Sequence, residues 1–188
     1  MQHGIVKMLL TLTLVGAPVA AQMVVNQPDP KAISQRGLSG RRAPSFALPD
    51  TKMIQYDILD YRGRWLILEY FKTDCPHCRD LTKVLDALKT RLGARVAMLS
   101  IVVPPDNTAT VGKYIAETKT SIPVLFDTGQ TAMWYFKATP QRPSFDSPHV
   151  FAINPQGMIV RDWNQSDTEA AGFAAQVEAT VGGGSQKK

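Results

Sequence analysis

The sequence is poor in the residues that build disulfide-stapled miniproteins and structural metal sites. It contains two cysteines and three histidines among 188 residues. A disulfide-dense miniprotein needs several cysteine pairs, and a structural zinc ion needs four ligands. The stability of the fold must therefore come from apolar burial, for which a chain of this length is sufficient.

Long runs of one charge are also absent. The chain carries 21 basic and 16 acidic residues, a formal net charge of +5, and no run of lysine or arginine exceeds two residues. Such dispersed charge indicates a solvated surface and no nucleic-acid partner. The composition, 44% hydrophobic and 20% charged, is that of a globular protein. It excludes collagen-like, coiled-coil, mostly disordered and multi-span membrane chains.

The one long apolar run lies near the N-terminus. Lys7 precedes the apolar segment Met8–Ala21, which ends in Val19-Ala20-Ala21 and is followed by Gln22. This is the layout of a secretory signal peptide, predicted over residues 1–21, and the run is too short to span a bilayer well. We therefore expect an extracytoplasmic protein, periplasmic or secreted, with an uncleaved membrane anchor as the alternative.

Composition divides the rest of the chain into a core and two flanking segments. Residues 22–43 are rich in proline, glycine and arginine without apolar periodicity, which predicts a flexible leader. Residues 182–188 form a Gly/Ser/Lys tail, also predicted to be flexible. Residues 44–181 alternate between strand-like and helix-like patterns and are predicted to form the folded domain.

The strand-like segments are apolar throughout. Residues 65–71 and 95–103 predict strands buried on both faces, and residues 123–126 predict a short strand. Residues 150–153 and 158–160 flank a Pro/Gly turn and predict a β-hairpin.

The helix-like segments lie between and after these strands. Leu81 to Leu92 has helical spacing, a second helix is expected to begin near Asn107 or Thr108, and residues 131–137 predict a short third helix. Ser166–Glu169 reads as the capping box of one terminal helix. The order of elements predicts an α/β fold with a central mixed sheet flanked by helices.

The motif Cys75-Pro76-His77-Cys78 stands where the first strand ends and the first main helix begins. A helix N-terminus has unpaired N–H groups and favours negative charge, so the position favours the thiolate form of Cys75. Pro76 suits the first helical position, and a protonated His77 adds positive charge. Cys78, one turn later, is expected to be more buried and to resolve a mixed disulfide on Cys75.

Three other interpretations of the cysteines are weaker. A zinc site lacks ligands, a structural disulfide would close too small a loop to add much stability, and inert core thiols do not explain the intervening proline and histidine. We favour a redox pair, the Cys75–Cys78 disulfide, with no bound cofactor and no metal.

Residues from about Ala43 to Val181 resemble the thioredoxin superfamily. The segments Ala43–Leu48, Arg62–Trp65, Ile122–Asp127 and Phe151–Gly157 resemble TlpA-like and AhpC/TSA-like (peroxiredoxin-like) members. The dipeptide Pro76-His77 and the stretch Glu69-Tyr70-Phe71 instead resemble DsbA-like oxidants.

The chain departs from both branches. TlpA-like proteins commonly carry a tryptophan where this chain has Asp74, and there is no room for the helical domain that DsbA-like proteins insert. The resemblance therefore implies a thioredoxin-like fold and leaves the redox direction open.

The resemblance also implies roles for residues outside the motif. Ser147-Pro148 corresponds to the cis-proline bond that faces the cysteine pair, where Ser147, Pro148 and Pro76 would bind a substrate chain; a trans proline at a strand start is the alternative. Glu69 corresponds to a buried acid that exchanges a proton with Cys78. The alternative for Glu69 is an edge position paired with a lysine.

Expectations for the neighbouring residues are more modest. Phe145 either contacts substrate or packs in the core, and both remain open. His149 is expected on the surface of its strand, and the aromatic residues 134–136 are expected to pack on the sheet.

The favoured function is an exported thiol–disulfide oxidoreductase that acts on protein thiols and disulfides and is reset by a membrane or extracytoplasmic redox partner. One alternative is a peroxiredoxin-like peroxidase that uses Cys75 alone, although Thr73 stands two rather than three positions before it. Another is a copper chaperone, with Cys75 and Cys78 as Cu(I) ligands and His77 or His149 as a third.

Overall fold

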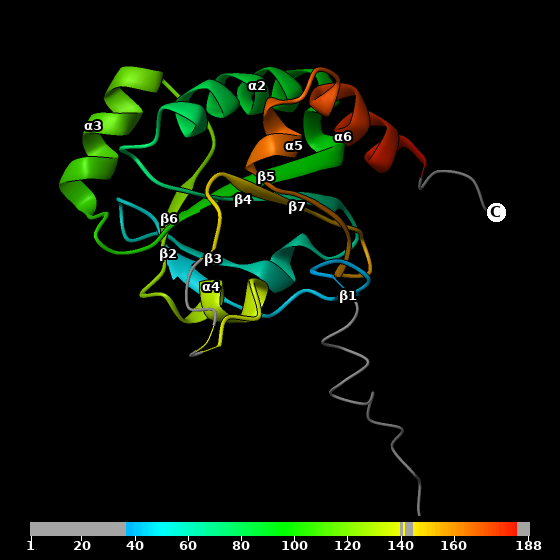
Figure 1. Cartoon of the computed structure of the whole chain (residues 1–188), viewed down its shortest axis with the longest axis horizontal. Coiled ribbons are helices and arrows are strands. Elements are labelled where there is room, and N and C mark those ends of the chain that lie inside the picture. The colour runs from blue at the N-terminus through cyan, green and yellow to red at the C-terminus, as the bar shows by residue number, and fades with distance from the viewer. Residues whose placement is uncertain (1–36, 140, 142–144, 184–188) are drawn as a thin grey trace, which may run out of the picture.

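A six-stranded mixed sheet forms the centre of the molecule (Figure 1). The computed structural model describes residues 37–139, 141 and 145–183. The strand order is β1-β8-β7-β4-β5-β6. The strands are β1 (Arg41–Arg42), β4 (Trp65–Phe71), β5 (Val96–Val102), β6 (Val124–Phe126), β7 (His149–Ile153) and β8 (Met158–Trp163). The predicted thioredoxin-like architecture, a mixed sheet flanked by helices, is confirmed.

The three strands predicted from apolar runs are parallel neighbours. β4 pairs with β5, and β5 with β6, in parallel, so their carboxyl ends meet at one edge of the sheet. Every residue of β5 is buried, which is why its sequence shows no polar alternation. The predicted hairpin is confirmed as β7 and β8, and β7 pairs antiparallel with β4.

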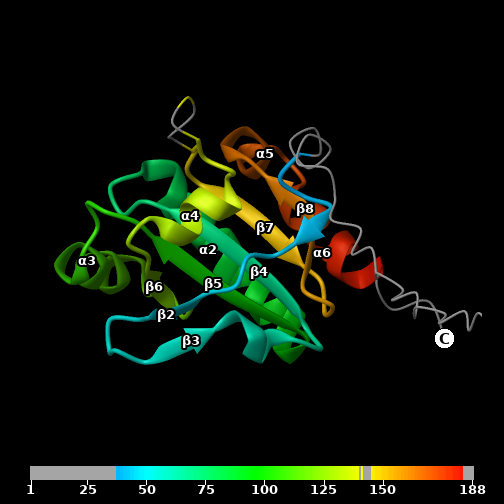
Figure 2. The same cartoon turned by 90° about the horizontal axis from the view of Figure 1, so that it is seen from below.

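Helices and a small ribbon cover the two faces of the sheet (Figures 1 and 2). One face carries α2 (Pro76–Leu92), α3 (Thr108–Thr118), α5 (Gln165–Glu169) and α6 (Phe173–Gly182). The other carries α4 (Gln130–Tyr135) and the two-stranded ribbon β2 (Ala47–Pro49) with β3 (Gln55–Asp57). Short 3-10 turns span Ile58–Tyr61 and Gly93–Arg95.

Alternate residues of β4 feed the two apolar layers. Leu68 and Tyr70 pack with Tyr135 and Phe151 on the α4 side. Ile67 packs with α2 and α6 on the opposite side. The sheet is therefore buried on both faces, and the loops at its edges are the parts free to carry a functional site.

The predicted leader ends earlier than its sequence suggested. Arg41–Arg42 pair with β8, the N–H of Gly40 donates to Ile159 O at 2.7 Å, and Ala43 is buried. The polar composition of this segment concealed a strand because backbone pairing does not require apolar side chains. The predicted signal peptide, the leader up to residue 36 and tail residues 184–188 lie outside the described residues.

The terminal helix prediction was wrong in detail. The capping box is formed by Asn164 and Asp167, each side chain bonding the other's backbone N–H at 3.1 Å. This box opens the short α5, not one long helix. The chain is extended at Ala170, and α6 begins afterwards from Gly172, whose φ of 99° favours glycine.

Candidate active site

Cys75 is the N-cap of α2, as the sequence predicted. Its backbone is extended, Pro76 occupies the first helical position, and the Cys75 Sγ accepts the N–H of Cys78 at 3.3 Å. The Cys75 sulfur therefore caps the first turn of α2, at the end where the unpaired N–H groups of the helix lie.

The second cysteine is completely buried, whereas Cys75 is partly exposed, and both are free thiols. Burial raises the pKa of the Cys78 thiol strongly. The exposed sulfur is therefore the one that a substrate can reach, and the buried sulfur needs a base before it can react.

Ser147 and Pro148 face this pair, and their peptide bond is cis, as the resemblance implied. The Ser147 carbonyl oxygen lies 3.9 Å from Cys75 Sγ, and its Oγ lies 3.5 Å from Cys78 Sγ. Residues 72 positions apart in the chain thus meet at the redox motif.

Glu69 lies inside the sheet, 1% exposed, so the alternative of an edge position paired with lysine is wrong. Burial raises the pKa of its carboxyl to about 7, against a lowering effect of the hydrogen bond that Ser100 Oγ donates at 2.6 Å. Its Oε1 is buried without a hydrogen-bond partner in the described part of the chain. A negative charge on Glu69 also contributes to raising the pKa of Cys78, after burial and the hydrogen bond with Cys75.

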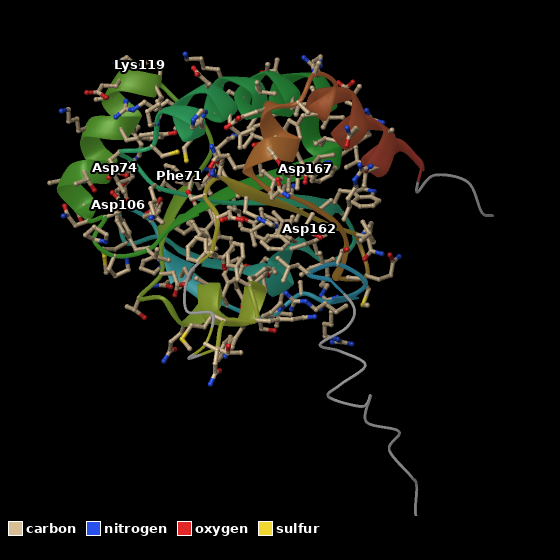
Figure 3. The ribbon with its side chains drawn as sticks, in the orientation of Figure 1. Phe71, Asp74, Asp106, Lys119, Asp162 and Asp167 are labelled. Carbon is tan, nitrogen blue, oxygen red and sulfur yellow. The ribbon has the colours of Figure 1, made fainter. Side chains whose placement is uncertain are left out.

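A carboxylate that sequence reasoning missed fixes the turn before the motif. Asp106 accepts the N–H of Thr73 at 3.1 Å, the Thr73 hydroxyl, and the Thr110 hydroxyl at 2.9 Å. Phe71, Asp74 and Asp106 gather at this end of the sheet (Figure 3). Arg79 adds a bond to the Thr73 carbonyl at 3.1 Å.

His77 has a partner that sequence reasoning also missed. Its Nδ1 lies 2.9 Å from Glu169 Oε1, and the two side chains are 54% and 44% exposed. Glu169 belongs to α5, more than 90 residues later in the sequence, so no local pattern could have paired the two.

His149 is a correction. It is 5% exposed rather than at the surface, and its Nε2 lies 3.1 Å from Asp162 Oδ2. The α4 side of β7 is covered by Phe136, whose ring meets the His149 ring edge-on at 5.0 Å. The rings of Phe145 and Phe136 are stacked, with their centroids 4.2 Å apart. This contact favours a packing role for Phe145 over substrate contact.

The expectation for the aromatic residues 134–136 was partly wrong. Tyr135 and Phe136 are buried and pack on the sheet as expected, whereas Trp134 is 56% exposed.

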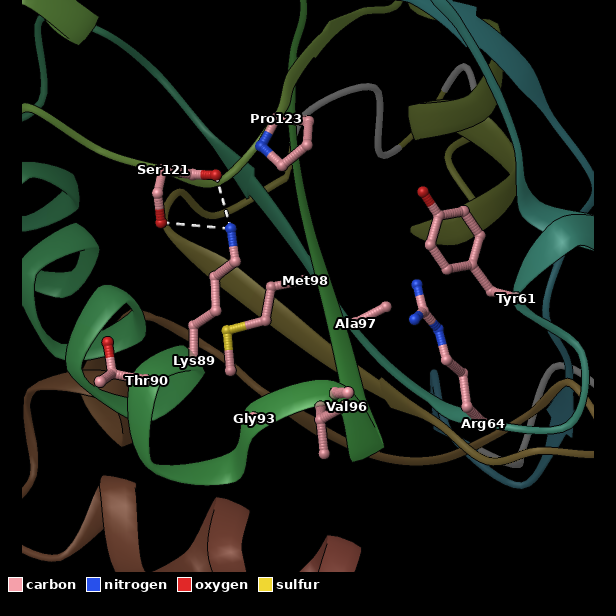
Figure 4. Close-up of a pocket in the computed structure, with 11 residues that line it drawn as sticks. Tyr61, Arg64, Lys89, Thr90, Gly93, Val96, Ala97, Met98, Ser121 and Pro123 are labelled. Carbon is pink, nitrogen blue, oxygen red and sulfur yellow. Dashed lines mark hydrogen bonds between the residues drawn. The ribbon is translucent and has the colours of Figure 1, made fainter.

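A pocket of about 530 Å³ lies away from the cysteines (Figure 4). It is lined by Gly93, Val96 and Met98, with Lys89 donating to the Ser121 carbonyl at 2.5 Å. The pocket lies beside the C-terminal end of α2, a 17-residue helix. It is therefore roughly 25 Å from Cys75 along the helix axis. The redox motif itself lies at the opposite edge of the sheet.

Residues 37–139, 141 and 145–183 contain no group of three His, Cys, Asp or Glu side chains arranged to hold a metal ion. No helix within those ranges is both long and apolar enough to cross a membrane.

Solved structures share this fold. A thiol:disulfide interchange protein from Bacteroides sp. matches with a TM-score of 0.61 at 19% identity, over 79% of this chain and 93% of that one. Peroxiredoxin Q from Xanthomonas campestris matches with a TM-score of 0.61 at 18% identity, over 75% of this chain and 92% of that one.

Sequence comparisons show to which proteins the chain is related. The chain is 24% identical over 132 residues to the thiol-disulfide oxidoreductase ResA from Bacillus subtilis (strain 168), which covers 70% of each chain. The model of the AhpC/TSA family matches residues 39–162, a span that contains Glu69, both cysteines and Pro148. Because this match extends over more than half of the sequence, the chain belongs to the AhpC/TSA family.

Proposed function

We propose that the protein is a thiol–disulfide oxidoreductase that exchanges disulfides with protein substrates through Cys75 and Cys78. The observation that carries the proposal is the arrangement of the two sulfurs. Cys75 is partly exposed at a helix N-terminus, and Cys78 is buried one turn behind it. The relative ResA, named for the same activity, supports it.

In the reducing direction, the Cys75 thiolate attacks one sulfur of a substrate disulfide. That disulfide breaks, a mixed disulfide forms on Cys75, and the second substrate sulfur leaves as a thiolate that takes up a proton. The cis Ser147–Pro148 segment, beside both sulfurs, would pair with the extended substrate chain, with Pro76 forming the other side of the contact.

Glu69 would then accept the proton of the Cys78 thiol. A carboxyl whose pKa is about 7 exists in both forms near neutral pH, so it can take up and return that proton. The Cys78 thiolate attacks Cys75 Sγ, the mixed disulfide breaks, and the reduced substrate departs. The protein keeps the Cys75–Cys78 disulfide and has transferred two electrons; the oxidising direction is the reverse sequence.

We also propose an extracytoplasmic location, based on the signal-peptide pattern of residues 1–21, and a redox partner in the membrane or the same compartment. A disulfide must be reset after each turnover, and that partner would supply or remove the two electrons.

Trapping tests the roles of the two cysteines. With a disulfide-containing protein such as insulin, Cys78→Ser should accumulate a mixed disulfide on Cys75, because the resolving thiol is gone. Cys75→Ser should form none and lose more than about 100-fold in rate. Gel electrophoresis without reductant and insulin turbidity measure the two results.

The same two variants distinguish the proposed oxidoreductase from the alternative of a peroxidase. If Cys75 reduced hydrogen peroxide rapidly and the Cys78→Ser protein trapped no substrate, the oxidoreductase proposal would be wrong.

A further inference from the structure

The imidazole of His77 is held by a carboxylate from a distant part of the chain. His77 is the second residue of α2, directly after Pro76, and its Nδ1 lies 2.9 Å from Oε1 of Glu169. Glu169 is the last residue of α5. The residue between the two cysteines that can carry charge is therefore joined to a second element.

The carboxylate of Glu169 is itself held in place. Gln165, one turn earlier, donates its Nε2 to the same Oε1 at 2.8 Å. The reciprocal bonds of Asn164 and Asp167 fix the start of α5, which packs beside α2 and β7 (Figure 3). Glu169 is thus presented by an ordered helix.

A second acid near His77, Asp80, is already engaged. Asp80 lies one turn along α2, where its Oδ1 accepts the ammonium group of Lys83 at 2.9 Å. Glu169 is therefore the carboxylate that binds the imidazole, and no hydrogen bond joins His77 to the Cys75 sulfur within the described residues. That sulfur contacts the Cys78 N–H and Ser147 instead.

The charge near Cys75 matters for redox strength. The thiolate exists only in the reduced protein, so a positive charge beside it stabilises the reduced form and makes the disulfide a stronger oxidant. A carboxylate that offsets the charge of the imidazolium, and holds its ring away from the Cys75 sulfur, has the opposite effect. It makes the disulfide a weaker oxidant.

We propose that Glu169 is a positioning residue that weakens the oxidising strength of the Cys75–Cys78 disulfide by holding His77 against α5. The inference rests on the proposed function and deepens it, because it bears on the redox direction. The Pro-His dipeptide alone favours an oxidant, and Glu169 shifts the site toward a reductant of substrate disulfides.

The test is the Cys75–Cys78 equilibrium of the full chain in glutathione buffers at pH 7. Glu169→Gln should shift the equilibrium constant about two- to fivefold toward the reduced protein, the size expected for a partly exposed ion pair. For a two-electron couple this is about 10 to 20 mV more oxidising. Glu169→Gln should have no further effect in a His77→Gln background.

Glu178→Gln is the matched control. Glu178 on α6 pairs with Arg91 on α2 at 2.8 Å, so this change removes the same charge and another helix–helix ion pair far from the cysteines. It should leave the equilibrium unchanged. An equal shift in this control, no shift in Glu169→Gln, or the same Glu169 effect without His77 would overturn the inference.

Further measurements distinguish a folding defect, a failure of the proposed function and a failure of this inference. If Glu169→Gln unfolds below the assay temperature, Gln165→Ala takes its place, because it removes only the hydrogen bond that supports Glu169. Gln165→Ala should shift the equilibrium in the same direction but by less. The absence of a shift in this variant would overturn the inference. If the wild-type protein forms no reversible Cys75–Cys78 disulfide, the proposed function fails. If it does so but Glu169→Gln changes nothing, only this inference fails.

Discussion

At the scale of single residues, Glu69 has the most consequential chemistry outside the cysteines. A carboxyl inside a sheet, with one oxygen lacking a hydrogen bond, is costly to ionise. Ser100 compensates at the other oxygen, but burial dominates and the pKa rises to about 7. The protein therefore keeps a carboxyl that titrates near pH 7 on the same side of the sheet as Cys78, at a cost in stability.

That cost predicts a pH dependence. Below pH 4.5, the ordinary value for this carboxyl, both folded and unfolded states hold the proton. Between there and about pH 7 only the folded state holds it, so stability falls as pH rises, by about 3 kcal/mol in total. Urea unfolding at pH 5 and 8 should show most of this loss in the wild type and its absence in Glu69→Gln.

Asp60→Asn, at an exposed position, should keep the wild-type pH dependence. An unchanged slope in Glu69→Gln would show that Glu69 ionises normally and would contradict its place as a proton relay.

At the scale of elements, the turn between β4 and α2 depends on the neighbouring β5–α3 loop. Asp106 bonds Thr73 twice and Thr110 once, so one carboxylate joins the loop after β5 to the residue two positions before Cys75. Asp106→Ala should cost about 2 kcal/mol, because the buried Thr73 loses charge-assisted bonds. Urea unfolding measures this cost.

Asp80→Ala is the comparison for that change. Asp80 forms an exposed ion pair with Lys83 on α2, and its removal should leave the free energy of unfolding nearly unchanged. Equal losses in the two variants would mean that the Asp106 network does not support the turn.

The edge strand β1 also belongs to the folded unit. Arg41 donates its Nε to Leu38 O at 2.8 Å and its guanidinium to the Tyr135 carbonyl, which joins the edge of the sheet to α4. A shortened chain that begins at Pro44 should be about 3 kcal/mol less stable in urea than one that begins at Gly37. Matching stabilities would place the domain boundary where the sequence first suggested it.

At the scale of the whole molecule, the features predicted from sequence are those with local signals. The apolar runs of β4 and β5 located the central strands, and the placement of Cys75 at a helix start followed from the strand before it. Glu69 stood out as the acid in an apolar run.

The features that sequence reasoning missed depend on contacts between distant segments. Glu169 and Asp106 reach the redox motif only after the chain folds, and no local pattern marks either residue as a partner of that motif. The sequence predicted a surface position for His149 because nothing local shows that Phe136 covers its strand. β1 was missed because its two arginines pair through their backbone.

The cap of α2 ties the chemistry to helix fraying. The atom that accepts the Cys78 amide hydrogen is the atom that would bond the substrate in the proposed reaction. A sulfur in a disulfide carries less negative charge than a thiolate and is a weaker acceptor, so this hydrogen bond should be weaker in the mixed disulfide and in the Cys75–Cys78 disulfide than in the reduced protein. The cap of α2 should therefore be strongest in the reduced protein, and the rate at which the Cys78 amide exchanges with deuterium should distinguish the reduced protein from either disulfide state.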